Sequence, residues 1–263
     1  EPVEQVKILG ECGIRFLDLR SAWNRNVLDL TEPDLDRFGG ILADAGVGVA
    51  AIGSPVGKST VDQPPAYELE RLRRACDVAE RLRCRYIRIF SFYPPEGKAI
   101  TEFRDQVFER LASWVAYVAR EHPGLVLAHE NETKIYGDLP ERCLEICRQF
   151  NGPNFTGCYD FANFTHDGVE RPFETAWTPL KPCIGYIHLK DFKRGLQPVP
   201  MGEGDGEAER ILADAAASGY DGFLSLEPHL AQAGQFKGFS GPELFKRAAA
   251  AARKVCGRAG MRV

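Results

Sequence analysis

Short apolar runs recur along the chain at nearly regular intervals. There are seven of them in 263 residues, and their starts lie 29 to 39 residues apart. Helical patterns lie between them; from Glu68 to Leu82, for example, an apolar residue recurs every three or four positions. A short apolar run followed by an amphipathic helix at this period is typical of repeated βα units and a parallel sheet. The runs cover residues 15–19, 47–52, 86–90, 125–128, 155–159, 184–189 and 223–226.

An α/β fold of this kind can be an open doubly wound sheet or a (β/α)8 TIM barrel. The runs show little polar alternation, as expected of strands that are covered on both faces. No change of composition and no linker rich in Pro, Gly or Ser divides the sequence, so we expect one domain over residues 1–263. The chain begins in a helical pattern over residues 3–12, and only seven strands are counted. A barrel would then lack its first strand in this chain, unless that strand lies upstream or another segment replaces it.

The balance of charge argues against a polyanionic partner. Lys and Arg number 33 against 37 Asp and Glu, which gives a net charge of −4 at pH 7. The chain therefore offers no overall basic field that would hold a nucleic acid. The longest apolar stretch, Leu111–Ala119, is far shorter than the roughly 20 residues of a membrane span. We expect neither a nucleic acid nor a membrane as partner.

Cysteine usage points to a reducing compartment. The chain has eight cysteines, none of them in a Cys-x-x-Cys pair, and several lie in apolar runs, where a thiol behaves as a small hydrophobic group. No secretory leader is recognised, and a disulfide framework is not expected of a chain this long without one. We therefore expect reduced thiols and a cytoplasmic protein.

Acidic or imidazole side chains lie at or just after the ends of the last four apolar runs. The carboxyl ends of parallel strands meet at one edge of a sheet, and in a barrel they build the active site. If the sheet curves closed, these four side chains converge on one point. Three oxygen donors and one imidazole suit a single divalent ion, Mn²⁺, Mg²⁺, Co²⁺ or Zn²⁺. The predicted metal ligands are Glu130, Asp160, His188 and Glu227.

Two neighbouring features are assigned to the scaffold. His129 precedes Glu130 on a predicted strand, so it should point to the opposite face and pack there. The segment Gly202–Gly206 is rich in glycine but carries two acidic residues and no following Lys-Ser/Thr, so it fits no nucleotide fingerprint. We expect it to form a loop at the rim.

The motifs at these strand ends resemble the xylose isomerase-like TIM-barrel superfamily of sugar isomerases and epimerases. The resemblance covers the chain from Phe16 onward, and it implies the (β/α)8 fold and the metal ligands named above. It also implies that Glu130 and Glu227 face the substrate carbon from opposite sides and that Arg194 contacts substrate oxygens. The matching motifs are Ala128-His129-Glu130-Asn131, Asp160, Ile187-His188-Leu189-Lys190-Asp191 and the stretch from Tyr220-Asp221-Gly222 to Leu226-Glu227-Pro228.

The reaction implied is a metal-dependent isomerisation or epimerisation of a sugar or keto-sugar through an enediolate. A proton next to a carbonyl needs a base at the carbon, and a metal ion stabilises the enediolate oxygens as a Lewis acid. Glu130 and Glu227 are the predicted catalytic pair, one removing the proton and the other returning it on the opposite face. The predicted substrate-binding residues are Lys190, Arg194, Asn163 and Arg20.

Two positions depart from the superfamily pattern. Many members carry Asp-x-x-His at the end of the sixth strand of the barrel, which corresponds to the fifth run of this chain. Here Asn163 stands in place of that His, and whether Asn163 or the nearby His166 replaces the imidazole stays open. Epimerases of the tagatose type have a second Glu six residues after the position of Glu130, where this chain has Tyr136. The substrate pocket therefore differs from the standard ketohexose pocket.

Three other functions are alternatives to this interpretation. The same enediolate can expel a β-group, which would make the enzyme a dehydratase or lyase of a keto-inositol or keto-sugar. A DNA-repair endonuclease of the same superfamily would need further histidines after the third and fourth strands of a full barrel. These strands correspond to the second and third runs of this chain, which end instead in Ile52-Gly53-Ser54-Pro55 and Ile89-Phe90-Ser91-Phe92. A non-catalytic sugar-binding barrel is disfavoured by the complete set of four ligands. In each enzyme interpretation the partner is a small sugar, and a homo-oligomer is compatible with the sequence.

Overall fold

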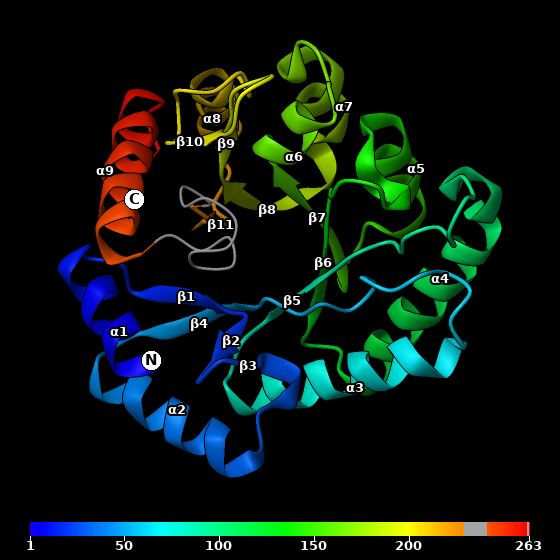
Figure 1. Ribbon diagram of the computed structural model, residues 1–263, viewed down its shortest axis with the longest axis horizontal. Coiled ribbons are helices and arrows are strands. Elements are labelled where there is room, and N and C mark those ends of the chain that lie inside the picture. The colour runs from blue at the N-terminus through cyan, green and yellow to red at the C-terminus, as the bar shows by residue number, and fades with distance from the viewer. Residues whose placement is uncertain (229–240, 262) are drawn as a thin grey trace. The chain divides into compact units, whose positions relative to one another are not determined.

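The structure is a computed structural model that describes residues 1–228, 241–261 and 263 (Figure 1). Its internal contacts group the chain into two compact units. The first unit comprises residues 1–129, 134–136 and 150–156, and the second comprises residues 130–133, 137–149 and 157–263. Each unit is described by itself.

The four parallel strands of the first unit correspond to the first four apolar runs. In order of hydrogen bonding they are β1 (Phe16–Leu19), β4 (Gly48–Ile52), β5 (Tyr86–Ile89) and β6 (Val126–Glu130), the last residue of which belongs to the second unit. A short antiparallel hairpin, β2 (Ser21–Ala22) with β3 (Arg25–Asn26), follows β1.

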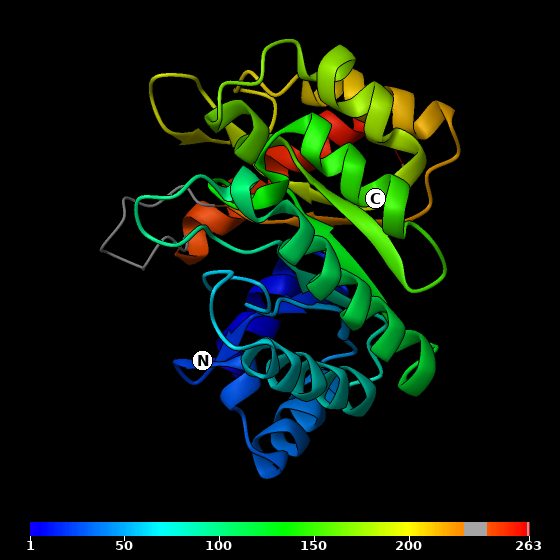
Figure 2. The ribbon, with the colours of Figure 1, turned by 90° about the vertical axis from the view of Figure 1, so that its right-hand side faces the viewer.

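The helices of the first unit begin and bury their faces as the sequence patterns predict. Thr31 and Asp34 form a reciprocal capping box at the start of α2, which satisfies backbone N–H groups that a helix start leaves without partners. In α3, Leu72, Cys76 and Ala79 are buried at steps of three and four, and Figure 2 shows this helix alongside α4. The helices are α1 (Pro2–Glu11), α2 (Glu32–Asp44), α3 (Pro65–Arg81) and α4 (Arg104–Glu121), with 3-10 turns at Val27–Asp29 and Ile100–Phe103.

The second unit contains the remaining three parallel strands. They are β7 (Phe155–Asp160), whose first two residues belong to the first unit, β8 (Ile184–Leu189) and β11 (Phe223–Leu226). A small antiparallel pair, β9 (Asp191–Phe192) and β10 (Pro198–Val199), follows β8. All seven predicted strands are therefore present in the described residues, in the order β1-β4-β5-β6 within the first unit and β7-β8-β11 within the second.

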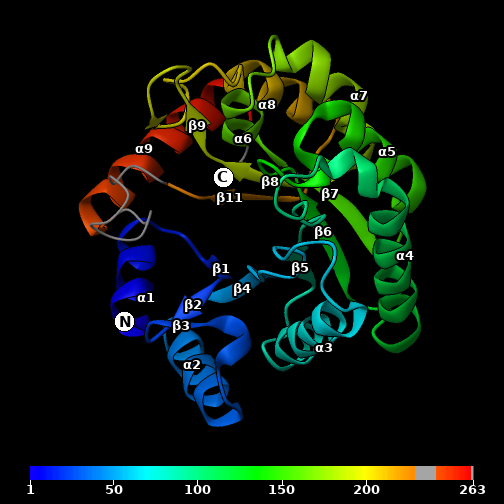
Figure 3. The same ribbon diagram turned by 45° about the vertical axis from the view of Figure 1, so that its right-hand side comes forward.

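The helices of the second unit follow its strands, and Figure 3 shows α8 beside α9, which it contacts. They are α5 (Pro140–Phe150), α6 (Phe161–His166), α7 (Thr178–Leu180), α8 (Ala208–Ala217) and α9 (Pro242–Arg258). A π-helical turn lies at Phe173–Trp177, and 3-10 turns lie at Lys181–Cys183 and at Tyr136–Asp138, whose first residue belongs to the first unit. Among the described helices of the whole chain, none has the length and apolar character needed to cross a membrane.

The apolar core of the second unit determines which way the strand residues point. Ile187 and Leu189 of β8 join a buried cluster with residues of the surrounding helices, such as Ile211 and Val255. Because side chains alternate along a strand, His188 between them faces the other side of the sheet. Burial of the apolar residues thus orients the imidazole.

The glycine-rich segment 202–206 is fastened to the end of β8 by one carboxylate. Asp191 accepts hydrogen bonds from the backbone N–H groups of Phe192, Gly202, Gly204 and Gly206, at 2.9, 2.9, 3.0 and 3.4 Å. The chain approaches the carboxylate so closely that a Cβ atom on Gly204 would lie 2.1 Å from Asp191 Oδ1. The glycines therefore allow the loop to wrap around an acidic side chain.

Substitution of Gly204 tests this close approach. Gly204→Ala should lower the free energy of unfolding by about 1–3 kcal/mol, because the added methyl group has no room beside Asp191. The control is Gly40→Ala in the interior of α2, where nothing lies within 4 Å of the new Cβ. That variant should gain about 0.5–1 kcal/mol from helix propensity. Urea unfolding measures both; equal stability of the two variants would contradict the described loop.

Candidate metal centre

Four polar side chains come together where β6, β7, β8 and β11 end. Glu130 is the last residue of β6, Asp160 is the last of β7, His188 is the fifth of β8, and Glu227 directly follows β11. In the parallel register Asp160 pairs with His188, and Ser225 and Leu226 pair with His188 and Leu189. Neighbouring strands therefore end at the same level, and all four residues belong to the second unit.

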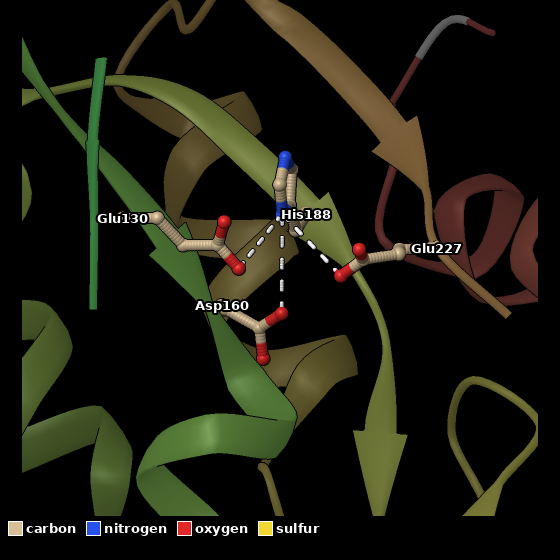
Figure 4. A group of neighbouring side chains, drawn as sticks. All are labelled: Glu130, Asp160, His188 and Glu227. Atoms are coloured by element: carbon tan, nitrogen blue, oxygen red, sulfur yellow. Dashed lines mark ion pairs between the residues drawn. The ribbon is translucent and has the colours of Figure 1, made fainter. Parts of the chain in front are cut away.

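Nδ1 of His188 faces all three carboxylates (Figure 4). It lies 3.3 Å from Glu130 Oε1, 3.7 Å from Glu227 Oε2 and 3.9 Å from Asp160 Oδ2. One ligand atom from each of the four residues lies within 4.8 Å of the other three. Glu130, Asp160 and His188 are buried, and Glu227 is partly exposed. The convergence that the strand ends predicted is present.

The two oxygens of Asp160 have different surroundings. Oδ1 accepts the backbone N–H of Asn163 at 2.8 Å and so caps the start of α6. Oδ2 is buried and accepts no hydrogen bond from any described residue, although the cations Lys190 and His188 lie 3.5 and 3.9 Å away. The capping bond fixes the carboxylate, and its other oxygen is directed toward the cluster.

The electrostatics of the cluster favour positive charge. Burial raises the pKa of Asp160 to about 6, against the opposing effect of Lys190. Burial alone would lower the pKa of His188, yet the Cys158 thiol and the Glu130 carboxylate raise it well above its ordinary value. The pKa of Lys190 is also raised, because the surrounding carboxylates, Asp160 first among them, outweigh its burial. Three acids at one buried point thus stabilise any cation placed among them.

The residues present fit a divalent cation. Carboxylate oxygens and one imidazole nitrogen are the donors that Mn²⁺, Mg²⁺, Co²⁺ and Zn²⁺ accept in proteins. The buried oxygen of Asp160 without a hydrogen-bond donor among the described residues is the kind of atom that a metal ion satisfies. Glu130, Asp160, His188 and Glu227 would hold the ion.

Two of the predicted substrate-binding residues lie at this cluster. Lys190 Nζ is 3.4 Å from Glu227 Oε2 and 3.2 Å from Asn163 Oδ1. The amide nitrogen of Asn163 donates to the Asn131 carbonyl at 2.8 Å and to Glu130 Oε1 at 3.4 Å. Asn163 therefore occupies the buried position beside the ligands.

The other candidates lie away from the four ligands or in the first unit. His166 is more than half exposed and pairs with Asp167 at 3.0 Å, so it does not replace the imidazole of the superfamily pattern. The Arg194 guanidinium donates to the Val169 carbonyl. Arg20 follows β1 in the first unit, where a Cβ atom added to Gly53 would lie 3.3 Å from the Arg20 Cβ. Tyr136 is buried in the first unit, edge-on to Phe108.

Two residues that support the cluster were not singled out from the sequence. Asn131 clamps the backbone of Asp160: its Nδ2 donates to the Asp160 carbonyl at 3.0 Å, and its Oδ1 accepts the Asp160 N–H at 2.7 Å. Cys158 lies close enough to His188 to raise the pKa of the imidazole. Cys158 lies two residues before Asp160 on β7, so strand alternation places both on one face, and this signal could have identified it.

Comparisons with known proteins agree with the fold. The model of the family described as xylose isomerase-like TIM barrel matches residues 6–255, which confirms the predicted TIM-barrel class. No curated protein sequence matches the chain.

Three solved structures resemble it at low identity. A xylose isomerase-like TIM barrel protein from Mycobacterium smegmatis in complex with magnesium is 16% identical, with a TM-score of 0.77 over 98% of this chain and 89% of that one. A D-psicose 3-epimerase with D-tagatose from Clostridium cellulolyticum H10 is 13% identical, with a TM-score of 0.74 over 99% and 94%. A probable 3-DHS dehydratase, AsbF, from Bacillus anthracis is 17% identical, with a TM-score of 0.74 over 95% and 92%.

Substitution of Asp160 tests the metal centre. Asp160→Ala should bind Mn²⁺ at least about a hundredfold more weakly. Loss of a metal ligand should lower the affinity at least as much as loss of a residue that hydrogen-bonds to a ligand. Elemental analysis after dialysis, together with calorimetric titration, measures this loss. Glu209→Gln is the control, since Glu209 is an exposed carboxylate of the same unit that pairs with Arg258 at 2.7 Å. Equal Mn²⁺ content in both variants would show that the ion is bound elsewhere.

Proposed function

Because the chain belongs to the xylose isomerase-like TIM-barrel family, we propose that it is a divalent-metal-dependent isomerase or epimerase of a sugar or keto-sugar. The observation that carries the proposal is the arrangement of the two glutamates. Glu130 and Glu227 reach the cluster from opposite sides, with Asp160 and His188 between them (Figure 4). Two carboxylates in this arrangement suit removal of a proton from one face of a carbon and its return to the other.

The divalent ion would supply Lewis-acid stabilisation of the negative charge that develops on the substrate oxygens. The protein's own groups do the proton transfer. A glutamate that donates one oxygen to the metal centre keeps a second oxygen for the substrate, and Glu130 and Glu227 each have that second oxygen. In this scheme one glutamate takes the proton next to the carbonyl, an enediolate forms, and the opposite glutamate protonates it.

Substrate contacts complete the proposal. Lys190 and Asn163, beside the ligands, and Arg194 and Arg20, from the loops that follow β9 and β1, remain the residues proposed to hold the oxygens of a small sugar. We place the protein in the cytoplasm, in keeping with its eight free thiols, seven of which are buried.

A dehydratase or lyase is the second candidate. It would use the same proton abstraction, but the enediolate would expel a β-hydroxyl or a β-linked group instead of being reprotonated. The amide of Asn163 at the position where many family members have an imidazole favours a pocket of altered specificity. One solved structure of similar fold is that of a probable dehydratase, and others are those of epimerases.

Neutral variants of the two glutamates test the proposed chemistry. Glu130→Gln and Glu227→Gln should each lower kcat by at least about a hundredfold, because the amide cannot take up the proton. Substrate should still bind. The measurement is turnover of keto-sugars in heavy water, with mass spectrometry of deuterium at the carbon next to the carbonyl, and Glu209→Gln is again the control.

The products decide between the candidates. A stereoisomer or an aldose–ketose pair supports the isomerase, and loss of water or of a β-group supports the dehydratase or lyase. Full turnover by both Gln variants would contradict the two-carboxylate chemistry. Binding of sugars without turnover by the wild type would favour the non-catalytic barrel.

A further inference from the structure

Lys190 lies inside the candidate metal centre. Its Nζ atom is 3.5 Å from Asp160 Oδ2, 3.4 Å from Glu227 Oε2 and 3.2 Å from Asn163 Oδ1. The side chain is only 12% exposed. Lys190 follows His188 by two residues, so strand alternation directs both side chains to one side of the sheet. The ammonium group therefore contacts two of the proposed metal ligands.

The position of Lys190 balances the charge of the proposed metal centre. Three carboxylates carry three negative charges, and a divalent ion compensates two of them. The ammonium of Lys190 supplies the third positive charge. His188 is neutral when it binds the ion, so the centre that holds an ion has no net charge. Buried charges without compensation are costly, and an excess negative charge would oppose formation of an anionic enediolate beside it.

Hydrogen bonds of Asn163 hold the Lys190 ammonium in this position. Asn163 accepts from Lys190 through its amide oxygen and donates through its amide nitrogen to Glu130 Oε1 and the Asn131 carbonyl. The same residue thus links the ammonium to a ligand on the far side of the cluster. A compact ammonium on a flexible stem fits between two carboxylates, which a planar guanidinium would bridge differently.

We propose that Lys190 is a fixed countercation of the metal centre, a positioning residue that holds the ligand carboxylates together before an ion binds and lowers their affinity for it. This role rests on the proposed metal-dependent function and needs no contact with substrate. It predicts two effects of opposite sign. Removal of the charge should lower the stability of the metal-free protein and raise its affinity for a divalent cation.

The first measurement is metal affinity. Lys190→Met keeps the length of the side chain and removes its charge, whereas Lys190→Gln also keeps a hydrogen-bonding group. At short range inside a protein, one unit charge changes the binding of a divalent ion by tenfold or more. Both variants, stripped of metal and titrated with Mn²⁺ by calorimetry, should therefore bind at least about tenfold more tightly than wild type. Lys190→Arg keeps the charge and should bind Mn²⁺ no more tightly than wild type.

The second measurement is thermal unfolding in the presence of EDTA. Both neutral variants should unfold at a lower temperature than wild type, because two carboxylates lose their countercharge. Adding Asp160→Asn to Lys190→Met should recover much of that loss, which a role in packing alone would not produce. Lys181→Met is the matched control: Lys181 pairs with Asp214 at 2.9 Å outside the centre, and its loss should leave the Mn²⁺ affinity unchanged.

The outcomes separate this inference from the proposed function. Equal or weaker Mn²⁺ binding by the neutral variants would overturn the countercation role, and so would a loss of stability that Asp160→Asn does not relieve. If Lys190→Met fails to fold, Lys190→Gln decides the question. If wild type binds no divalent ion, the metal-dependent function fails, and the unfolding experiment alone decides the role of Lys190.

Discussion

The repulsion among three carboxylates at one buried point is the constraint on which the rest of the candidate site depends. Glu130, Asp160 and Glu227 all lie within 4 Å of His188 Nδ1, in a region from which water is largely excluded. Such a group is stable only where cations compensate it and hydrogen bonds fix its members. Lys190 is one cation of this group, and His188 is a second while it is protonated. The divalent ion that we propose would take the place of the His188 proton. Asn131 and Asn163 supply the hydrogen bonds.

An apolar scaffold holds the charged side chains of this cluster in place. Ile187 and Leu189 are buried among the helices of the second unit, and this burial turns His188 toward the acids. Asp160 is held by a helix cap on one oxygen and by the Asn131 side chain on its backbone. Asp191, directly after Lys190, ties the glycine-rich loop to the same strand end. The side chains of the cluster are thus positioned by residues that lie outside it, as precise sites require.

The sequence predicts the strands and the convergence of four side chains at their ends well, because both follow from periodicity. Apolar runs at a βα period determine a parallel sheet, and a parallel sheet brings the ends of successive strands to one edge, so Glu130, Asp160, His188 and Glu227 could be identified together. Side-chain directions beyond the strands could not. Arg194 lies in a loop, where its contact with the Val169 carbonyl depends on a backbone path that no periodic pattern specifies. The place of Lys190 among the acids depends in the same way on rotamers and neighbours, and the clamp by Asn131 is a contact between two strand ends.

The most direct test of the account is the position of a bound ion. Crystals grown with Mn²⁺ and measured at the manganese absorption edge should show one strong anomalous peak among the four side chains. The peak should lie about 2.0–2.4 Å from His188 Nδ1 and from an oxygen of each carboxylate. A peak bound by other residues, or none at this place in crystals saturated with Mn²⁺, would contradict the assignment of these strand ends as a metal centre.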